Sequence, residues 1–162
     1  MTETKDSIGL FELVEAYVRA QDPKLSAGWR AYHAQQVVAY ELALQVKVPR
    51  TIAEFPADLR ALFFLFAGTV ESLVQLRHPL EGGLEMGLLF MQLERAGPRG
   101  GVVLQGLEYA GAQVSSLRSI ELQLLADLMV LACGRVPERV PLAQVRSTSA
   151  YPQSTPPRDE DW

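Results

Sequence analysis

The sequence predicts an all-α protein: a bundle of about five helices, with a long C-terminal helix of heptad pattern and an extended proline-rich tail. Three observations lead to this prediction. Apolar side chains recur at intervals of three and four residues over much of the first 134 positions, the period of an amphipathic helix. Proline and glycine interrupt that pattern where helices should end. Beyond Gly134 the helical period stops, and this last part holds five of the ten prolines.

We therefore expect one helical domain over residues 1–134 and an extended or disordered arm over residues 135–162. The chain has 162 residues, of which 48% are hydrophobic and 21% charged, so it can form a core. About the last 16 residues should be flexible in isolation, because polar and proline-rich sequence buries too little to offset its ordering entropy.

The first two helices are expected over about residues 7–20 and from residue 25 onward. Asp22 and Pro23 end the first. Residues 40–48 alternate apolar and polar side chains, which suits a strand as well as a helix. We favour a helix to about Val46, because good helix formers dominate and no turn signal intervenes. A short edge strand is the alternative.

A third helix should carry the phenylalanine-rich stretch and continue to about Arg77, before His78 and Pro79. Thr51 and Glu54 have the spacing of a capping box before it. Residues 62–70 are apolar on nearly every side, which is typical of a helix at the centre of a bundle or in an interface. The interaction candidates of this helix are Phe63, Phe64 and Phe66.

Glycines are frequent between residues 82 and 111. A helix is expected over residues 84–95, and the stretch AGPRGG after it should be its end. A phosphate-binding loop would need a strand, a glycine-rich turn and a characteristic lysine or glycine spacing, which are missing. We therefore interpret these glycines as helix ends and points of close backbone packing.

The most regular pattern is a heptad seam over residues 102–132, interrupted by one polar residue, Glu121. A single helix over this range would be about 45 Å long, and Gly106 and Gly111 weaken it, so a break near Gly111 is compatible with the pattern. Glu121 should either meet an arginine across an interface or fix the helix register. The interaction candidates on the seam are Leu117, Glu121, Leu124 and Leu128.

No residue pattern indicates catalysis, a metal site or a cofactor. His33 and His78 lack ligand-type neighbours at helical offsets, so the Glu-x-x-His pairs of di-iron bundles are absent. Ser115 and Ser116 have no histidine nearby in the sequence. We therefore predict a protein that is not an enzyme and that holds no cofactor and no metal.

Composition also indicates the cellular compartment and the classes of partner that we expect. The single cysteine, Cys133, cannot form an internal disulfide, so we expect a reducing, cytoplasmic environment. The longest apolar run is half the length of a membrane-spanning helix, and the N-terminal residues do not resemble a secretory signal. With a net charge of −4 and no basic stripe, nucleic acid is an unlikely direct partner.

The abundance of apolar helix surface predicts a non-enzymatic assembly or adaptor subunit that acts through protein–protein contacts. We expect self-association into a homo-oligomer, a larger complex, or both. The tail offers another contact, because Trp162 could fill a pocket while Asp159, Glu160 and Asp161 meet basic residues around it. The alternative for this tail is a frayed, solvated end.

Two other functions stay open at this stage. The first is a small-ligand or cofactor-binding sensor bundle, whose pocket would be lined by Trp29, Tyr32, His33, Phe63, Phe64 and Phe66. The second is a small helical subunit of a nucleoprotein complex, which would contact nucleic acid through Arg99, Arg118 and Arg135.

Overall fold

The computed structural model describes residues 7–75, 90–113 and 117–152, and most of them are helical, as the sequence predicts. Contacts divide the chain into two compact units. The terminal unit joins Met1–Val48 to Val136–Trp162, and the central unit is Pro49–Arg135. The sequence-based boundary, with a body over residues 1–134 and an arm over 135–162, stays a prediction.

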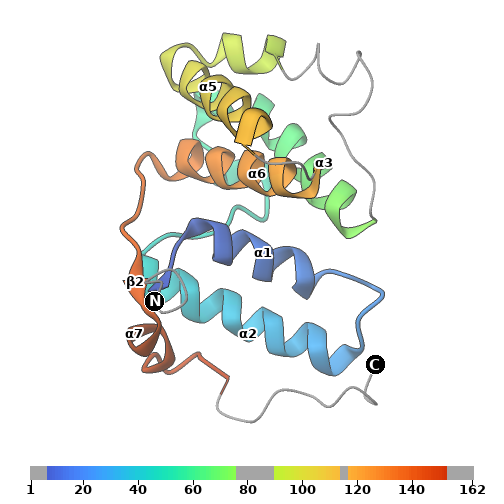
Figure 1. Ribbon diagram of the computed structural model, residues 1–162, viewed down its shortest axis with the longest axis vertical. Helices are drawn as coiled ribbons and strands as arrows, with labels where there is room; N and C mark the ends of the chain where they lie inside the picture. Colours follow the sequence, from blue (N-terminus) through green and yellow to red (C-terminus); the bar gives the residue numbers. More distant parts are fainter. Residues whose placement is uncertain (1–6, 76–89, 114–116, 153–162) are drawn as a thin grey trace. The chain divides into compact units, whose positions relative to one another are not determined.

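The terminal unit is built on a hairpin of two helices, α1 (Leu10–Ala20) and α2 (Ala27–Leu44) (Figure 1). A two-residue strand before α1, β1 (Ser7–Ile8), pairs antiparallel with β2 (Val140–Pro141). The chain then forms α7 (Leu142–Arg146), which contacts α2. We expected residues 136–145 to be extended, but four of them form the start of this short helix, whose Val145 is fully buried.

One arginine joins the two ends of the chain within the terminal unit. Arg139 donates hydrogen bonds from Nε to Ser7 Oγ and from Nη2 to the Ser7 carbonyl, both at 2.9 Å. Its Nη2 also lies 3.2 Å from the Glu12 carboxylate. That carboxylate accepts from the N–H of Gly9 at 2.8 Å, where α1 begins. Arg139 therefore ties the returning segment to the first turn of α1.

The ambiguous residues 40–48 are helical as far as Leu44, two residues short of the predicted end. Gln45 then adopts a left-handed conformation (φ 58°), and residues 46–48 are neither helix nor strand. The Glu41 carboxylate accepts from the N–H of Val48 at 2.7 Å, so a helix side chain holds the segment that follows.

The central unit begins with two single-turn 3₁₀ helices, η2 (Ile52–Glu54) and η3 (Ala57–Leu59), and continues into α3 (Ala61–Val74). Glu54 accepts from the N–H and the hydroxyl of Thr51, at 3.1 and 3.2 Å, so the predicted capping residues pair, although the element they start is η2. Residues 90–95 are helical and precede α5 (Pro98–Gln113) and α6 (Leu117–Cys133).

Helix α6 contacts both α3 and α5 (Figure 1). Arg118, at the start of α6, donates to the Leu73 carbonyl at the end of α3. Arg99, at the start of α5, donates to the Leu131 carbonyl near the end of α6. Helix α6 therefore runs opposite to its two neighbours. Where the heptad pattern suggested one long helix, α5 and α6 are two helices that pack against each other, and residues 114–116 between them lie outside the described residues.

The tight turn between residues 95 and 98 and the start of α5 after it each depend on one glycine. Gly97 has φ +72° and its N–H donates to the Glu94 carbonyl at 3.0 Å, which ends the preceding helix. A Cβ on Gly100 would lie 1.8 Å from the Leu93 carbonyl oxygen. Gly101, one residue further, has open space around it. The interpretation of glycines as helix ends and close packing points is therefore confirmed for Gly97 and Gly100, but not for Gly101.

Gly100→Ala should lower the free energy of unfolding by about 2 kcal/mol or more, because backbone atoms must move to admit the methyl group. Gly101→Ala should be neutral or raise it by up to about 1 kcal/mol, since alanine favours a helix. Urea unfolding followed by circular dichroism compares the two variants. Equal effects would contradict the close approach at Gly100.

Candidate functional site

Helix α2 has one face that is covered within the terminal unit. The buried residues of this face recur at intervals of four, three and four, so they form one stripe along the helix. Helix α1 is the main neighbour of α2 in this unit. The buried residues of this covered row are His33, Val37, Tyr40 and Leu44.

An aromatic cluster extends this covered face toward the start of α2. The rings of Trp29 and His33 are stacked, with centroids 5.7 Å apart and planes inclined by 25°, and Tyr32 meets both rings edge-on. His33 is 8% exposed, and its Nδ1 lies 2.8 Å from Gln36 Oε1. Burial lowers the pKa of His33, although the Gln36 hydrogen bond opposes this shift. His33 is therefore held neutral inside a packed cluster.

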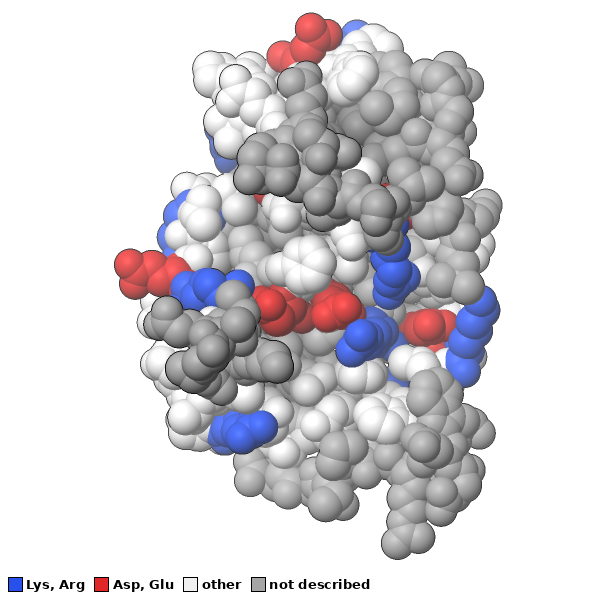
Figure 2. All heavy atoms as spheres, viewed as in Figure 1, with Lys and Arg blue, Asp and Glu red and all other residues white. Residues whose placement is uncertain are grey.

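A second face of α2, beside the covered one, is exposed and apolar. Ala34, Val38 and Leu42 lie four residues apart and so share one side of the helix. Val38 is 43% exposed and Leu42 is 55% exposed. On the face seen in Figure 2, charged side chains of both signs lie over α1, whereas the surface over α2 is mostly uncharged. We call Ala34, Val38 and Leu42 the α2 stripe.

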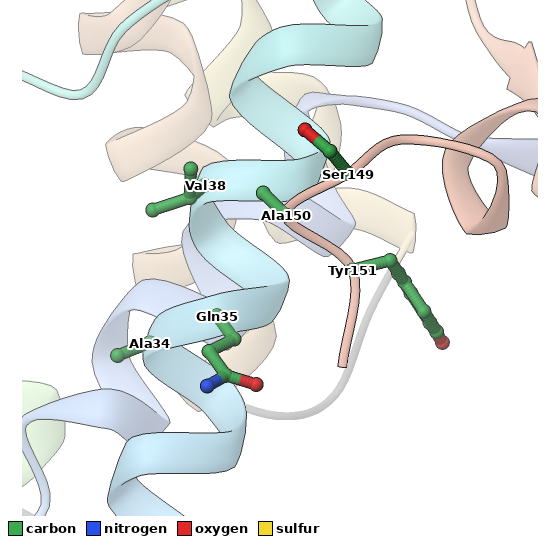
Figure 3. Close-up of a pocket in the computed structure, with 6 residues that line it drawn as sticks. All are labelled: Ala34, Gln35, Val38, Ser149, Ala150 and Tyr151. Carbon is green, nitrogen blue, oxygen red and sulfur yellow. The ribbon is translucent and has the colours of Figure 1, made fainter. Parts of the chain in front are cut away.

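An open groove of about 530 Å³ runs beside the α2 stripe (Figure 3). Its second wall is the segment that follows α7, and Ala150 of this wall lies against the turn of α2 that carries Val38. The lining is mostly apolar apart from Gln35, Ser149 and the hydroxyl of Tyr151. The groove residues are Ala34, Gln35, Val38, Ser149, Ala150 and Tyr151.

Tyrosines fix the second wall to α2. The side chain of Tyr151 hydrogen-bonds with that of Tyr32, and burial together with this neighbour raises the pKa of Tyr32. Burial raises the pKa of Tyr40 to about 12, and Tyr151 and Tyr32 add to the shift. Pro152, directly after Tyr151, is buried. The groove is therefore bounded by anchored residues on both sides.

The phenylalanines predicted as interaction residues differ in exposure. Phe64 on α3 is 69% exposed, Phe63 is half-buried and Phe66 is buried. Phe66 and Phe63 both meet the buried ring of Phe55, with centroids 5.8 Å apart. Of the three, Phe64 is the one that offers most of its ring to another molecule.

The seam residues predicted on α6 contribute to the interior. Glu121, Leu124 and Leu128 are fully buried, so they present no surface to another chain. Glu121 accepts a hydrogen bond from the Ser72 hydroxyl of α3 at 3.2 Å, and the expected arginine across an interface or register role stays a prediction. The side chain of Leu117 lies outside the described residues, and so do Asp159, Glu160, Asp161 and Trp162.

The residues expected to form a ligand pocket or a nucleic-acid surface do not lie as the sequence suggested. Of the six residues proposed for a ligand pocket, Trp29, Tyr32 and His33 belong to the terminal unit, and the three phenylalanines belong to the central unit. No single unit holds all six. Arg99 and Arg118, proposed to contact nucleic acid, instead donate to carbonyls near helix ends, and Arg135 is exposed.

Sequence reasoning missed the α2 stripe and the groove. The spacing of Ala34, Val38 and Leu42 was a usable signal, because it places a second apolar row beside the covered one. The second wall had no such signal, because residues 149–151 reach α2 from a distant part of the chain.

Within the described ranges, no cluster of three or more potential metal-binding side chains occurs. The helices there are also too short or too polar to cross a bilayer. Comparison of the chain with known families, with curated proteins and with solved structures gives no match.

Glu121→Ala should lower the free energy of unfolding by about 2–4 kcal/mol, because it opens a cavity and removes the buried acceptor of Ser72. Glu121→Gln should recover most of this loss, since the amide fills the same space and can still bond to that hydroxyl. Denaturant unfolding measures both. The control, Glu94→Ala, makes the same change at an exposed position of the central unit. Similar losses at the two positions would contradict the role of Glu121.

His33 should make the fold less stable as the pH falls. Its folded pKa is lowered below the unfolded value of 6.5, so the unfolded chain takes up the proton more readily. The stabilising contribution is present above that value and is lost below it. His33→Gln should therefore show a weaker decline between about pH 7 and pH 5 in denaturant titrations. Parallel curves would refute this.

Asp127 changes the stability of the fold with pH in the opposite direction, over a range that overlaps that of His33. Burial raises its pKa to about 6, against a hydrogen bond from Gln123 that lowers it. Its contribution to stability therefore decreases as the pH rises from about 4 to about 6. Because Asp127 is unchanged in His33→Gln, the difference between variant and wild type isolates the histidine.

Proposed function

We propose that this protein is a non-enzymatic helical assembly or adaptor subunit that acts through protein–protein contacts, and that the α2 stripe with its groove is the main contact surface. The observation that carries the proposal is the exposure of Val38 and Leu42 beside an open, mostly apolar groove. Exposed apolar rows of this kind mark interaction sites more often than isolated surface leucines do.

The shape of this surface suits a helix or an extended peptide. A partner helix that docks in a groove presents anchors at intervals of three and four residues, and the intervals of four in the α2 stripe can pack against such a row. Ala34 is small, so a partner backbone can come close to α2 at that turn. Val38 and Leu42 would then be the side chains that bury most area on binding.

Self-association is the form of assembly that we propose first. The heptad seam was the original reason to expect it, but the described seam residues from Val103 to Leu131 are buried. The α2 stripe replaces the seam as the self-association surface in this proposal. The single cysteine still favours a reducing, cytoplasmic location.

Phe64 supports a second contact surface, which an adaptor requires. It lies on the exposed side of α3 with Ala61, Ala67 and Gly68, none of which is charged. Aromatic side chains are enriched among the residues that dominate binding energy. We propose that the central unit contacts a further protein through Phe64.

A small-ligand function is the second candidate, because the groove volume falls in the range of ligand pockets. Thermal-shift measurements against apolar ligands address it. Stabilisation that is lost in Val38→Glu would favour this function.

Replacing both Val38 and Leu42 by glutamate should weaken self-association by about tenfold or more, because charge must be buried at the contact. Light scattering coupled to size-exclusion chromatography, over a range of micromolar concentrations, measures the change. The control is Val102→Glu, the same substitution at an exposed valine of the central unit. A chain that stays monomeric throughout, both as the wild type and with residues 153–162 removed, would overturn self-association.

A further inference from the structure

We infer that residues 153–162 of this chain dock across its own α2 groove, with Trp162 against the α2 stripe and the acidic residues before it near Arg30 and Arg146. This inference rests on the proposed role of the stripe as a contact surface. It assigns the groove an occupant, which neither the helical pattern nor the groove itself identifies.

The first reason is where these residues begin. Ser149, Ala150 and Tyr151 are a wall of the groove, and Tyr151 is bonded to Tyr32 of α2. Pro152 is buried next to them. Residue 153 therefore leaves the described fold beside the α2 stripe.

The second reason is length. Ten residues span at most roughly 33 Å when extended. The distance along α2 from Val38 back to Arg30 is about 12 Å, at 1.5 Å per residue. The segment can therefore reach every turn of the stripe, with residues to spare for Pro156 and Pro157. A tether this short gives an effective concentration in the millimolar range, so even weak intramolecular docking is populated.

The third reason is chemical complementarity. The segment carries a tryptophan directly after three acids, Asp159–Asp161 in the sequence PPRDEDW. The groove offers an apolar floor, and Arg30 lies four residues before Ala34 on the same side of α2. Burial raises the pKa of Tyr32, and Arg146, in α7, is close enough to that tyrosine to oppose the rise. Arg30 and Arg146 are exposed, and neither forms an ion pair with the described residues.

Docking in this way would mask the contact surface. A partner that binds the α2 stripe would have to displace the segment, so its apparent affinity would fall by the fraction of chains in which the groove is open. The C-terminal residues would thus set how readily the protein assembles.

The test uses a fluorescein-labelled synthetic peptide of residues 153–162 and two full-length proteins. One is the wild type, and the other carries Trp162→Ala with Asp159→Asn, Glu160→Gln and Asp161→Asn. Fluorescence anisotropy should show the peptide binding at least about tenfold more tightly to the tail variant, whose groove is open. Adding Val38→Glu to that variant should abolish binding, and adding Val102→Glu should leave it unchanged.

Equal affinity for the two proteins, or no binding to the tail variant, would overturn the inference. Acrylamide quenching of Trp162, taken as the difference between wild type and Trp162→Phe, should not fall as the protein concentration rises. Quenching that falls as the concentration rises would show that a second copy receives the segment, which also overturns the proposal. If the tail does not dock but replacing Val38 and Leu42 by glutamate still abolishes self-association, the inference fails and the proposed function stands.

Discussion

The terminal unit depends on a single constraint: α2 carries two apolar rows and the hairpin with α1 covers only one of them. His33, Val37, Tyr40 and Leu44 are buried, and α1 is the main neighbour of α2. The row through Val38 and Leu42 is left with a strip of irregular chain along one side. An apolar row in this position costs solvation free energy that a monomer does not recover, which is why a surface of this kind points to binding.

The sequence predicted local features well because they depend on local spacing. Apolar periodicity placed α1 and α2 within a few residues, and Gly97 ends a helix while Gly100 allows a close backbone approach, as the glycine-rich composition suggested. It did not predict the return of the chain after Gly134. That return relies on Arg139 meeting Ser7, 132 residues away, and on a strand pair of two residues, and neither leaves a periodic trace.

The heptad seam shows what periodicity leaves undetermined. A row of leucines indicates that a helix face is covered, but not whether the same chain or another chain covers it. In the central unit the chain folds back, so α3 and α5 contact α6 and the described seam residues are buried. Glu121 fits this arrangement because Ser72 of α3 supplies a donor. One partner is a serine 49 residues earlier, which no spacing within α6 could reveal.

Arginines illustrate the same point for charge. Counted along the sequence, Arg99 and Arg118 are isolated cations available to any anion. In the fold, each lies at the start of one helix and donates to a carbonyl near the end of another, where backbone acceptors lack helical partners. These contacts fix the antiparallel order of α3, α6 and α5 and use two cations that a nucleic-acid surface would need. Among the described residues, Arg30 and Arg146 donate to no such helix-end carbonyl, and both lie near the groove. Two exposed arginines therefore lie in the terminal unit, near its apolar surface.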